Sequence, residues 1–306
     1  MRSFSSQLGA VLWSILVASL IAIFGAGVWT ALISTNLRYT PAIPWAVPVM
    51  ALILWAMWAY LGGKGWPRRT AEARRAYLRA NRLSPRLWMW SLLGSIASLI
   101  ALAGLWIVLV ELVGVGGNPT IPDYSQYPWY TVVLGLMMGS VVSPLTEEAA
   151  FRGYAQVKLE RVFPVAVAVL IASLLFAFWH GPTQGFYWSK LLFYFIVGIA
   201  FGVTATLANS SLAALPAHIL GDLTFFFLIW PFDKTRPLVW RDGANVWFWI
   251  HIIQAALFAV LAVLAFRRLA RTARNLRTGS GSGQPIEPDL EAIGAPEMRE
   301  GRQPDI

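Results

Sequence analysis

The sequence has no cysteine and only three histidines among its 306 residues. The lack of cysteine excludes disulfides, thiolate zinc sites and a cysteine nucleophile, and a three-histidine metal site would have to use every histidine in the chain. Charged residues are also scarce, at 13%, whereas hydrophobic residues make up 57%. Ordinary soluble domains are about half apolar and about a quarter charged. The composition therefore excludes a soluble or disordered chain and favours one bundle of membrane helices.

Apolar runs long enough to cross a bilayer, which takes about 20 residues, recur along the chain. They predict an all-α, polytopic membrane bundle of about eight transmembrane helices, near 8–33, 43–62, 87–113, 129–150, 163–180, 190–208, 211–230 and 245–266. The first run is too long for the apolar part of a signal peptide, so we expect an uncleaved anchor. The segment 278–306 is acidic and rich in Gly, Ser and Pro, which predicts a disordered tail.

Basic residues flank the apolar runs, and the formal net charge is +9. Eight lie in the connection 63–86 and five in 267–277, whereas the connection 114–128 has no Lys or Arg. Because basic loops stay inside, we expect the basic side and both termini to be cytoplasmic. This placement favours contact of the basic loops with anionic lipid, and no nucleic-acid partner is expected.

Six ionisable residues stand inside the fourth, fifth and seventh apolar runs. An ionisable group at the centre of a membrane helix costs roughly 2.5–3.5 kcal/mol, so stability alone would favour apolar residues there. Such a set indicates a functional site, with a purely structural polar network as the alternative. The six are Glu147, Glu148, Arg152, His180, His218 and Asp222.

The spacing within the first two of these runs separates the two glutamates. Glu148 and Arg152 are four residues apart, so they share a helix face and are expected to form a structural pair. Glu147 lies about 100° round the helix and is left free to face a cavity. If the turn lies at Arg161–Pro164, Glu147 and His180 lie at the same depth, because both are about the same number of helical residues from it. An antiparallel hairpin would bring the two side chains together.

The third group, His218 and Asp222, is also four apart and shares a face. A carboxylate and an imidazole that share a water can activate it as a nucleophile, and a second imidazole can stabilise an oxyanion. With Asp222 orienting His218, the set suits amide hydrolysis without a covalent intermediate. The alternative is a divalent metal such as zinc held by Glu147, His180 and His218, although no H-E-x-x-H motif is present.

The same residues form three ordered motifs: E-E-x-x-x-R at 147–152, F-x-x-x-H at 176–180 and H-x-x-x-D at 218–222. In order, spacing and membrane context the chain resembles the CPBP family of intramembrane proteases over about 130–225. That family contains CAAX prenyl endopeptidases and bacteriocin-processing or immunity proteins. The resemblance implies a protease whose site opens into a cavity between membrane helices.

The resemblance also implies a role for each residue of the motifs. Glu147 matches the general base and His180 its partner on the water, while His218 and Asp222 match the oxyanion-stabilising pair. Glu148 and Arg152 match a supporting salt bridge. Asp222 departs from the Asn of the eukaryotic-type prenyl proteases. An ionised Asp222 would repel an oxyanion, so it is either protonated or acts only through His218.

Four regions follow from these features: N-terminal transmembrane helices over 1–128 with the basic cytoplasmic loop 63–86, a CPBP-like catalytic core over 129–230, the last transmembrane helix with its basic flank over 231–277, and the tail 278–306. We expect a CAAX-type endopeptidase of a bacterial inner membrane, acting on a membrane-associated peptide or protein. A glutamate-type mechanism without a cofactor is preferred to a metal-dependent one. The alternatives are a non-catalytic immunity or scaffold protein of the same family and, with less support because no repeat is visible, a proton-coupled transporter.

Overall fold

The computed structural model describes residues 3–114 and 124–279. Every regular element in these two stretches is helical, which confirms the all-α prediction. The α-helices are α1 (Phe4–Tyr39), α2 (Ala46–Leu61), α3 (Ala71–Leu78), α4 (Pro85–Val113), α5 (Trp129–Glu147), α6 (Gln156–Glu160), α7 (Val165–Trp179), α8 (Gly181–Gln184), α9 (Trp188–Ala208), α10 (Leu215–Thr224), α11 (Val239–Asp242) and α12 (Val246–Gly279). Tighter or wider turns are η1 (Arg68–Thr70), η2 (Glu148–Ala155), η3 (Phe225–Ile229) and η4 (Trp230–Thr235).

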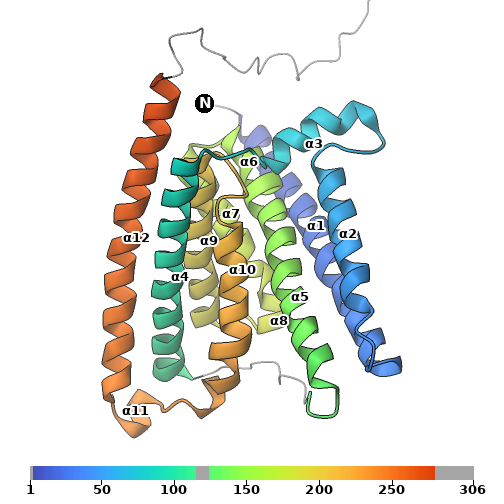
Figure 1. Ribbon diagram of the computed structural model, residues 1–306. Coiled ribbons are helices and arrows are strands. Elements are labelled where there is room, and N and C mark those ends of the chain that lie inside the picture. The colour runs from blue at the N-terminus through green and yellow to red at the C-terminus, as the bar shows by residue number, and fades with distance from the viewer. Residues whose placement is uncertain (1–2, 115–123, 280–306) are drawn as a thin grey trace, which may run out of the picture.

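Within residues 3–114 and 124–279, seven helical stretches are long and apolar enough to cross a membrane, so the chain is a multi-pass membrane protein. The expected run at 43–62 forms α2, which has only 16 residues. Its length is about 24 Å, short of the ~30 Å hydrocarbon core. The start of α1 and the end of α12 lie at the same end of the bundle, together with α3 (Figure 1).

The last helix is longer than the predicted last span. α12 continues through the basic segment 267–277 and ends at Gly279, so this flank is helical and the helix includes the first two residues of the predicted tail, whose disorder stays a prediction. The rest of that tail, 280–306, lies outside the described residues, as does most of the connection 114–128. The continuation is understandable, because arginine is a good helix former and the segment contains no proline or glycine before Gly279.

The helices that carry the predicted site residues pack at unusually short range. A Cβ on Gly25 of α1 would overlap the side chain of Thr146, the residue before Glu147 on α5. A Cβ on Gly198 of α9 would lie 2.7 Å from the Cβ of Ser173 on α7. Small residues allow membrane helices to approach closely and gain dispersion energy. These contacts fix the relative positions of α1, α5, α7 and α9.

The basic connection between α2 and α4 is not a merely solvated loop. Arg74 and Arg79 are buried. Arg74 donates to the carbonyls of Tyr60 and Lys64, at 2.7 and 3.0 Å. Arg79 donates to the carbonyl of Arg152 at 2.8 Å and pairs with a carboxylate on α6 at 2.7 Å. The segment around α3 is therefore attached to the centre of the bundle.

Candidate active site

The two glutamates stand where the helix changes its geometry. Pro144 lies inside α5, and η2, which follows directly, is a π-helix. Proline lacks the N–H that would bond the carbonyl of Ser140, which favours a local irregularity beside Glu147 and Glu148. The irregularity is the wider π-helical turn, a feature that recurs at functional sites. It leaves Glu147 as the last residue of α5 and Glu148 as the first of η2.

Glu147 is the central side chain of the cluster, and it is buried. Its Oε1 accepts a hydrogen bond from Ser143 Oγ at 2.9 Å and lies 3.9 Å from His180 Nε2. Its Oε2 lies 3.5 Å from His218 Nε2 and has no hydrogen-bond partner among residues 3–114 and 124–279. The turn at 161–164, between α6 and α7, lies where it was predicted, and the expected meeting of Glu147 and His180 is confirmed.

His180 ends α7, and its ring orientation is fixed on three sides. Nδ1 lies 2.9 Å from the carbonyl oxygen of Phe176, which can only accept, so Nδ1 is the donor. In the neutral ring Nε2 then carries the lone pair, directed toward Glu147. Phe176, four residues before His180, packs on the imidazole with ring centroids 4.6 Å apart. Tyr194 of α9, which the sequence did not single out for this site, stacks on the other face at 3.7 Å and 13°.

Glu148 and Arg152 form the predicted ion pair, with Nη1 3.4 Å from Oε1. Both are buried, and the guanidinium lies over the rings of Phe176 at 4.1 Å and Phe201 at 5.4 Å. Glu148 has a second role that spacing did not reveal. Its Oε1 lies 2.9 Å from His218 Nδ1, a contact between residues 70 positions apart. Glu148 therefore links the arginine to the histidine.

Asp222 lies at the edge of the cluster. Its side chain is 23% exposed, and Oδ1 is 3.9 Å from His218 Nε2. We expected Asp222 to orient His218, but the short contact that fixes this ring is made by Glu148. Asp222 and Glu147 instead lie on the same side of His218, near Nε2. The structure thus brings all four predicted catalytic side chains together while changing which carboxylate holds the imidazole.

A cavity of about 220 Å³ opens beside these groups. Glu147, His180, His218 and Asp222 line it together with Ser143. The remaining wall is largely aromatic and includes Phe193, Tyr194, Phe225, Phe226 and Trp230. A polar cluster at one side of an apolar cavity is the usual form of a site for an organic substrate.

The three side chains considered as metal ligands do not form a compact ligand set in the described stretches, where no group of three or more His, Asp or Glu residues is arranged to hold a metal ion. Nδ1 of His218 contacts Glu148 and Nδ1 of His180 donates to a backbone carbonyl, which leaves Nε2 of both rings on the side of Glu147. Histidines that bind a metal through Nε2 make the same kind of Nδ1 contact, so these bonds do not distinguish a metal-dependent site from a glutamate-type one. We derive no catalytic step through a metal.

Comparison with known proteins identifies the segment that carries this cluster. Residues 128–224 match the family model described as type II CAAX prenyl endopeptidase Rce1-like. The chain contains an Rce1-like CAAX endopeptidase domain. All six predicted site residues fall inside the matched segment, which covers roughly a third of the sequence. No curated protein and no solved structure matches the chain.

The match confirms the family resemblance read from the three motifs. It does not include the four preceding helices α1 to α4 or α12, although α1 packs directly on the Rce1-like domain through Gly25. The family is one of CAAX-type intramembrane endopeptidases, which agrees with the cluster of buried ionisable groups between apolar helices.

Proposed function

We propose that the chain is an intramembrane endopeptidase in which Glu147 activates a water that cleaves a peptide bond. The main support is the position of Glu147: it is buried, one carboxylate oxygen is free of hydrogen bonds to the described residues, and both imidazoles lie within 3.9 Å. The substrate is a membrane-associated peptide or protein. A prenylated CAAX tail is one member of this class.

In the first step Glu147 and His180 orient the water. Glu147 Oε2 accepts one proton of the water, while the lone pair of His180 Nε2 accepts a hydrogen bond from the other. The contacts of His180 with Phe176 and Tyr194 support this assignment, because they keep Nε2 on the side of the carboxylate. Attack on the carbonyl carbon forms the new C–O bond and moves the carbonyl π electrons onto oxygen.

In the second step His218 stabilises the oxyanion. With Glu147, Glu148 and Arg152 charged and Asp222 protonated, the buried cluster has a net charge of −1, and a proton on His218 makes it neutral. Buried uncompensated charge is costly, which supports an imidazolium that donates from Nδ1 to Glu148 and from Nε2 into the cavity. Nε2 then offers a charged hydrogen bond to the developing oxyanion.

In the last step Glu147 returns the proton that it took from the water. The proton goes to the leaving nitrogen, the C–N bond breaks, and the electrons of the oxyanion re-form the carbonyl of the new carboxyl group. Asp222 lies too close to Nε2 to help an oxyanion while it is ionised. We therefore assign it an indirect role through His218, or a protonated state during catalysis.

The decisive test is Glu147→Gln, which keeps the shape of the side chain and removes the base. The matched control is Glu72→Gln on the exposed side of α3. Membrane peptides from cells that express the wild type, Glu147→Gln or Glu72→Gln are compared by mass spectrometry. We expect cleavage products to disappear in Glu147→Gln and to persist in the control. Products that persist at wild-type levels in Glu147→Gln would refute the proposal.

We also propose that the end of the bundle carrying α3 and the end of α12 faces the cytoplasm of a bacterial inner membrane. The support is the concentration of arginine and lysine at this end. Because the chain has no cysteine, single cysteines report orientation cleanly. Asn81→Cys should resist an impermeant maleimide in intact cells, while Asp242→Cys should react. The opposite labelling pattern would reverse the assignment.

A further inference from the structure

A second hollow, on the surface between α4 and α12, shares no lining residue with the cavity beside Glu147. It has a volume of about 590 Å³. Apolar side chains line most of its length, and three arginines lie toward the end of α12. The residues that define it best are Leu93, Ile96, Leu261 and Leu264 along the wall, with Arg267, Arg268 and Arg271 beyond them. We call this hollow the α4–α12 groove.

The length of the α4–α12 groove matches one leaflet of a bilayer. The two helices run antiparallel and lie side by side (Figure 1), and a Cβ on Gly94 would lie 2.6 Å from the ring of Phe266. That contact sets the register and places Trp90 of α4 near the level of Arg271. From Trp90 to Ile100, the lining of α4 extends over about 15 Å, half of the ~30 Å hydrocarbon core.

The three arginines are available to a ligand. All are exposed, and none forms a salt bridge with any residue in the described part of the chain. Arginine binds phosphate oxygens in pairs through its planar guanidinium. Basic pockets at the ends of membrane helices recognise anionic lipid headgroups. The apolar wall and the cationic end of the groove together fit a ligand that is both hydrophobic and anionic.

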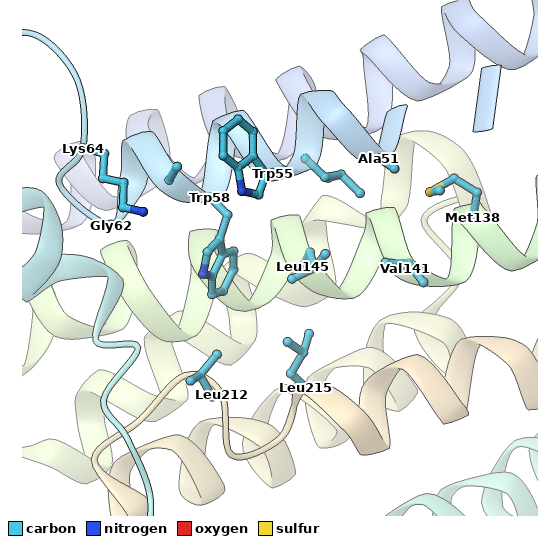
Figure 2. A pocket seen from close by; sticks show the side chains of 12 residues that line it. Ala51, Trp55, Trp58, Gly62, Lys64, Met138, Val141, Leu145, Leu212 and Leu215 are labelled. Atoms are coloured by element: carbon cyan, nitrogen blue, oxygen red, sulfur yellow. The ribbon is translucent and has the colours of Figure 1, made fainter. Parts of the chain in front are cut away.

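A second groove of similar size lacks this combination of an apolar wall and several arginines. The α2–α5 groove has about 550 Å³ and is lined by Trp55, Trp58, Val141 and Leu145. Figure 2 shows Lys64 at one end of it, beside Gly62, and apolar side chains over the rest of its labelled wall. Lys64 is the single cation of that lining. The two grooves therefore offer comparable apolar volume with different charge.

We propose that the α4–α12 groove binds one anionic glycerophospholipid. Its phosphate contacts Arg267, Arg268 and Arg271, and an acyl chain lies along the apolar wall within the leaflet on the basic side. A soluble acidic segment is a poor occupant, because burying carboxylates against Leu93 and Leu264 has no compensating contacts. The site is independent of peptide cleavage and would hold if the cluster around Glu147 were not catalytic.

Native mass spectrometry of the full-length protein tests the site. The purified protein is mixed with equal amounts of phosphatidylglycerol and phosphatidylcholine, and the lipid that stays bound is identified. We expect one phosphatidylglycerol to be retained in preference to phosphatidylcholine. The triple change of Arg267, Arg268 and Arg271 to Gln should lower that preference at least about tenfold. Lys64→Gln, in the α2–α5 groove, is the matched control and should leave it unchanged.

A second variant separates a lipid site from simple attraction of anions. Ala97→Phe fills the groove and leaves all three arginines in place. It should also lower retention of phosphatidylglycerol, because the acyl chain loses its space. Full retention in Ala97→Phe, full retention in the triple variant, or an equal loss in Lys64→Gln would each overturn the proposal. Inorganic phosphate should not displace the lipid; displacement at equal concentration would mean that the groove binds only a free anion.

Discussion

α5 separates two hollows of opposite character. On one side Ser143 and Glu147 line the 220 Å³ cavity, and on the other Val141 and Leu145 line the 550 Å³ α2–α5 groove. The smaller hollow holds the buried carboxylates and imidazoles, and the larger one has Lys64 as its single ionisable lining residue. Volume therefore does not locate the site. Apolar lining costs a membrane protein little, whereas each buried ionisable group is expensive and persists where the function needs it.

The largest expected effect is on the stability of the fold, and it concerns the hollow that holds the buried charged groups. Arg152→Ala leaves Glu148 buried beside His218 without its cation, which should destabilise the protein by about 3–5 kcal/mol. Thermal unfolding in detergent and the yield of folded protein report the change. Arg161→Ala is the control, since Arg161 also lies over an aromatic ring, Tyr77 at 4.4 Å, but is exposed. Equal stability of the two variants would mean that the buried pair does not support the fold.

The next largest effect is expected on the rate of cleavage, in a variant that keeps the fold. His180→Ala removes the group assigned to orient the water, and cleavage should fall about 100-fold or more. The unfolding temperature should fall less than in Arg152→Ala, because the change removes the ring contacts with Phe176 and Tyr194 but leaves the buried pair of Glu148 and Arg152 intact. The control is His251→Ala, which removes the histidine outside the cluster. If both variants cleave a peptide substrate at the same rate, His180 has no part in the reaction.

A smaller effect is expected at Tyr194, whose ring stacks on His180. Tyr194→Phe keeps the stacked ring and should retain most activity, whereas Tyr194→Leu frees the imidazole and should lower kcat by about tenfold. The role assigned is positioning, so KM should move little in either variant. An equal loss in both variants would show instead that the hydroxyl acts on the substrate.

The smallest effect on cleavage is expected for a change in the α2–α5 groove, on the other side of α5. Ala51 lines the α2–α5 groove, and Ala51→Leu narrows it. The rate of cleavage should stay within about twofold of the wild type, because an exposed apolar substitution away from the site changes little. The rate of cleavage of a peptide substrate is the measurement. A loss comparable to that of His180→Ala would break the comparison, since it would mean that the substrate uses both hollows.

The sequence identified the site better than it identified the contacts within it. Six ionisable residues in apolar runs could be recognised because each is costly in lipid, and the turn at 161–164 fixed the depth at which Glu147 meets His180. Spacing of four residues also paired Glu148 with Arg152. It could not show that Glu148 reaches His218, because helical spacing gives the face of one helix and not the face of the helix opposite.

Two further features were hidden for the same reason. Tyr194 is one of many aromatic residues in an apolar run, and nothing local distinguishes a ring that stacks on an imidazole from one that packs in the core. Arg79 stands in a run of basic residues that resembles a solvated loop, yet its guanidinium lies inside the bundle. Charge patterns correctly assigned this segment to a basic end but could not separate its two buried arginines from the exposed ones.

Arg79 lies outside the matched segment 128–224 and contacts the turn that holds the glutamates, so we expect a functional fragment to include it. Its guanidinium bonds the backbone oxygen of Arg152, and Gly153 meets the carbonyls of Tyr77 and Leu78 so closely that a Cβ would lie 3.1 Å from each. The turn that holds the glutamates is thus braced from outside the recognised family segment. A fragment beginning at 128 would keep every motif residue and lose this brace, so we expect it not to hold the two glutamates in the positions described above.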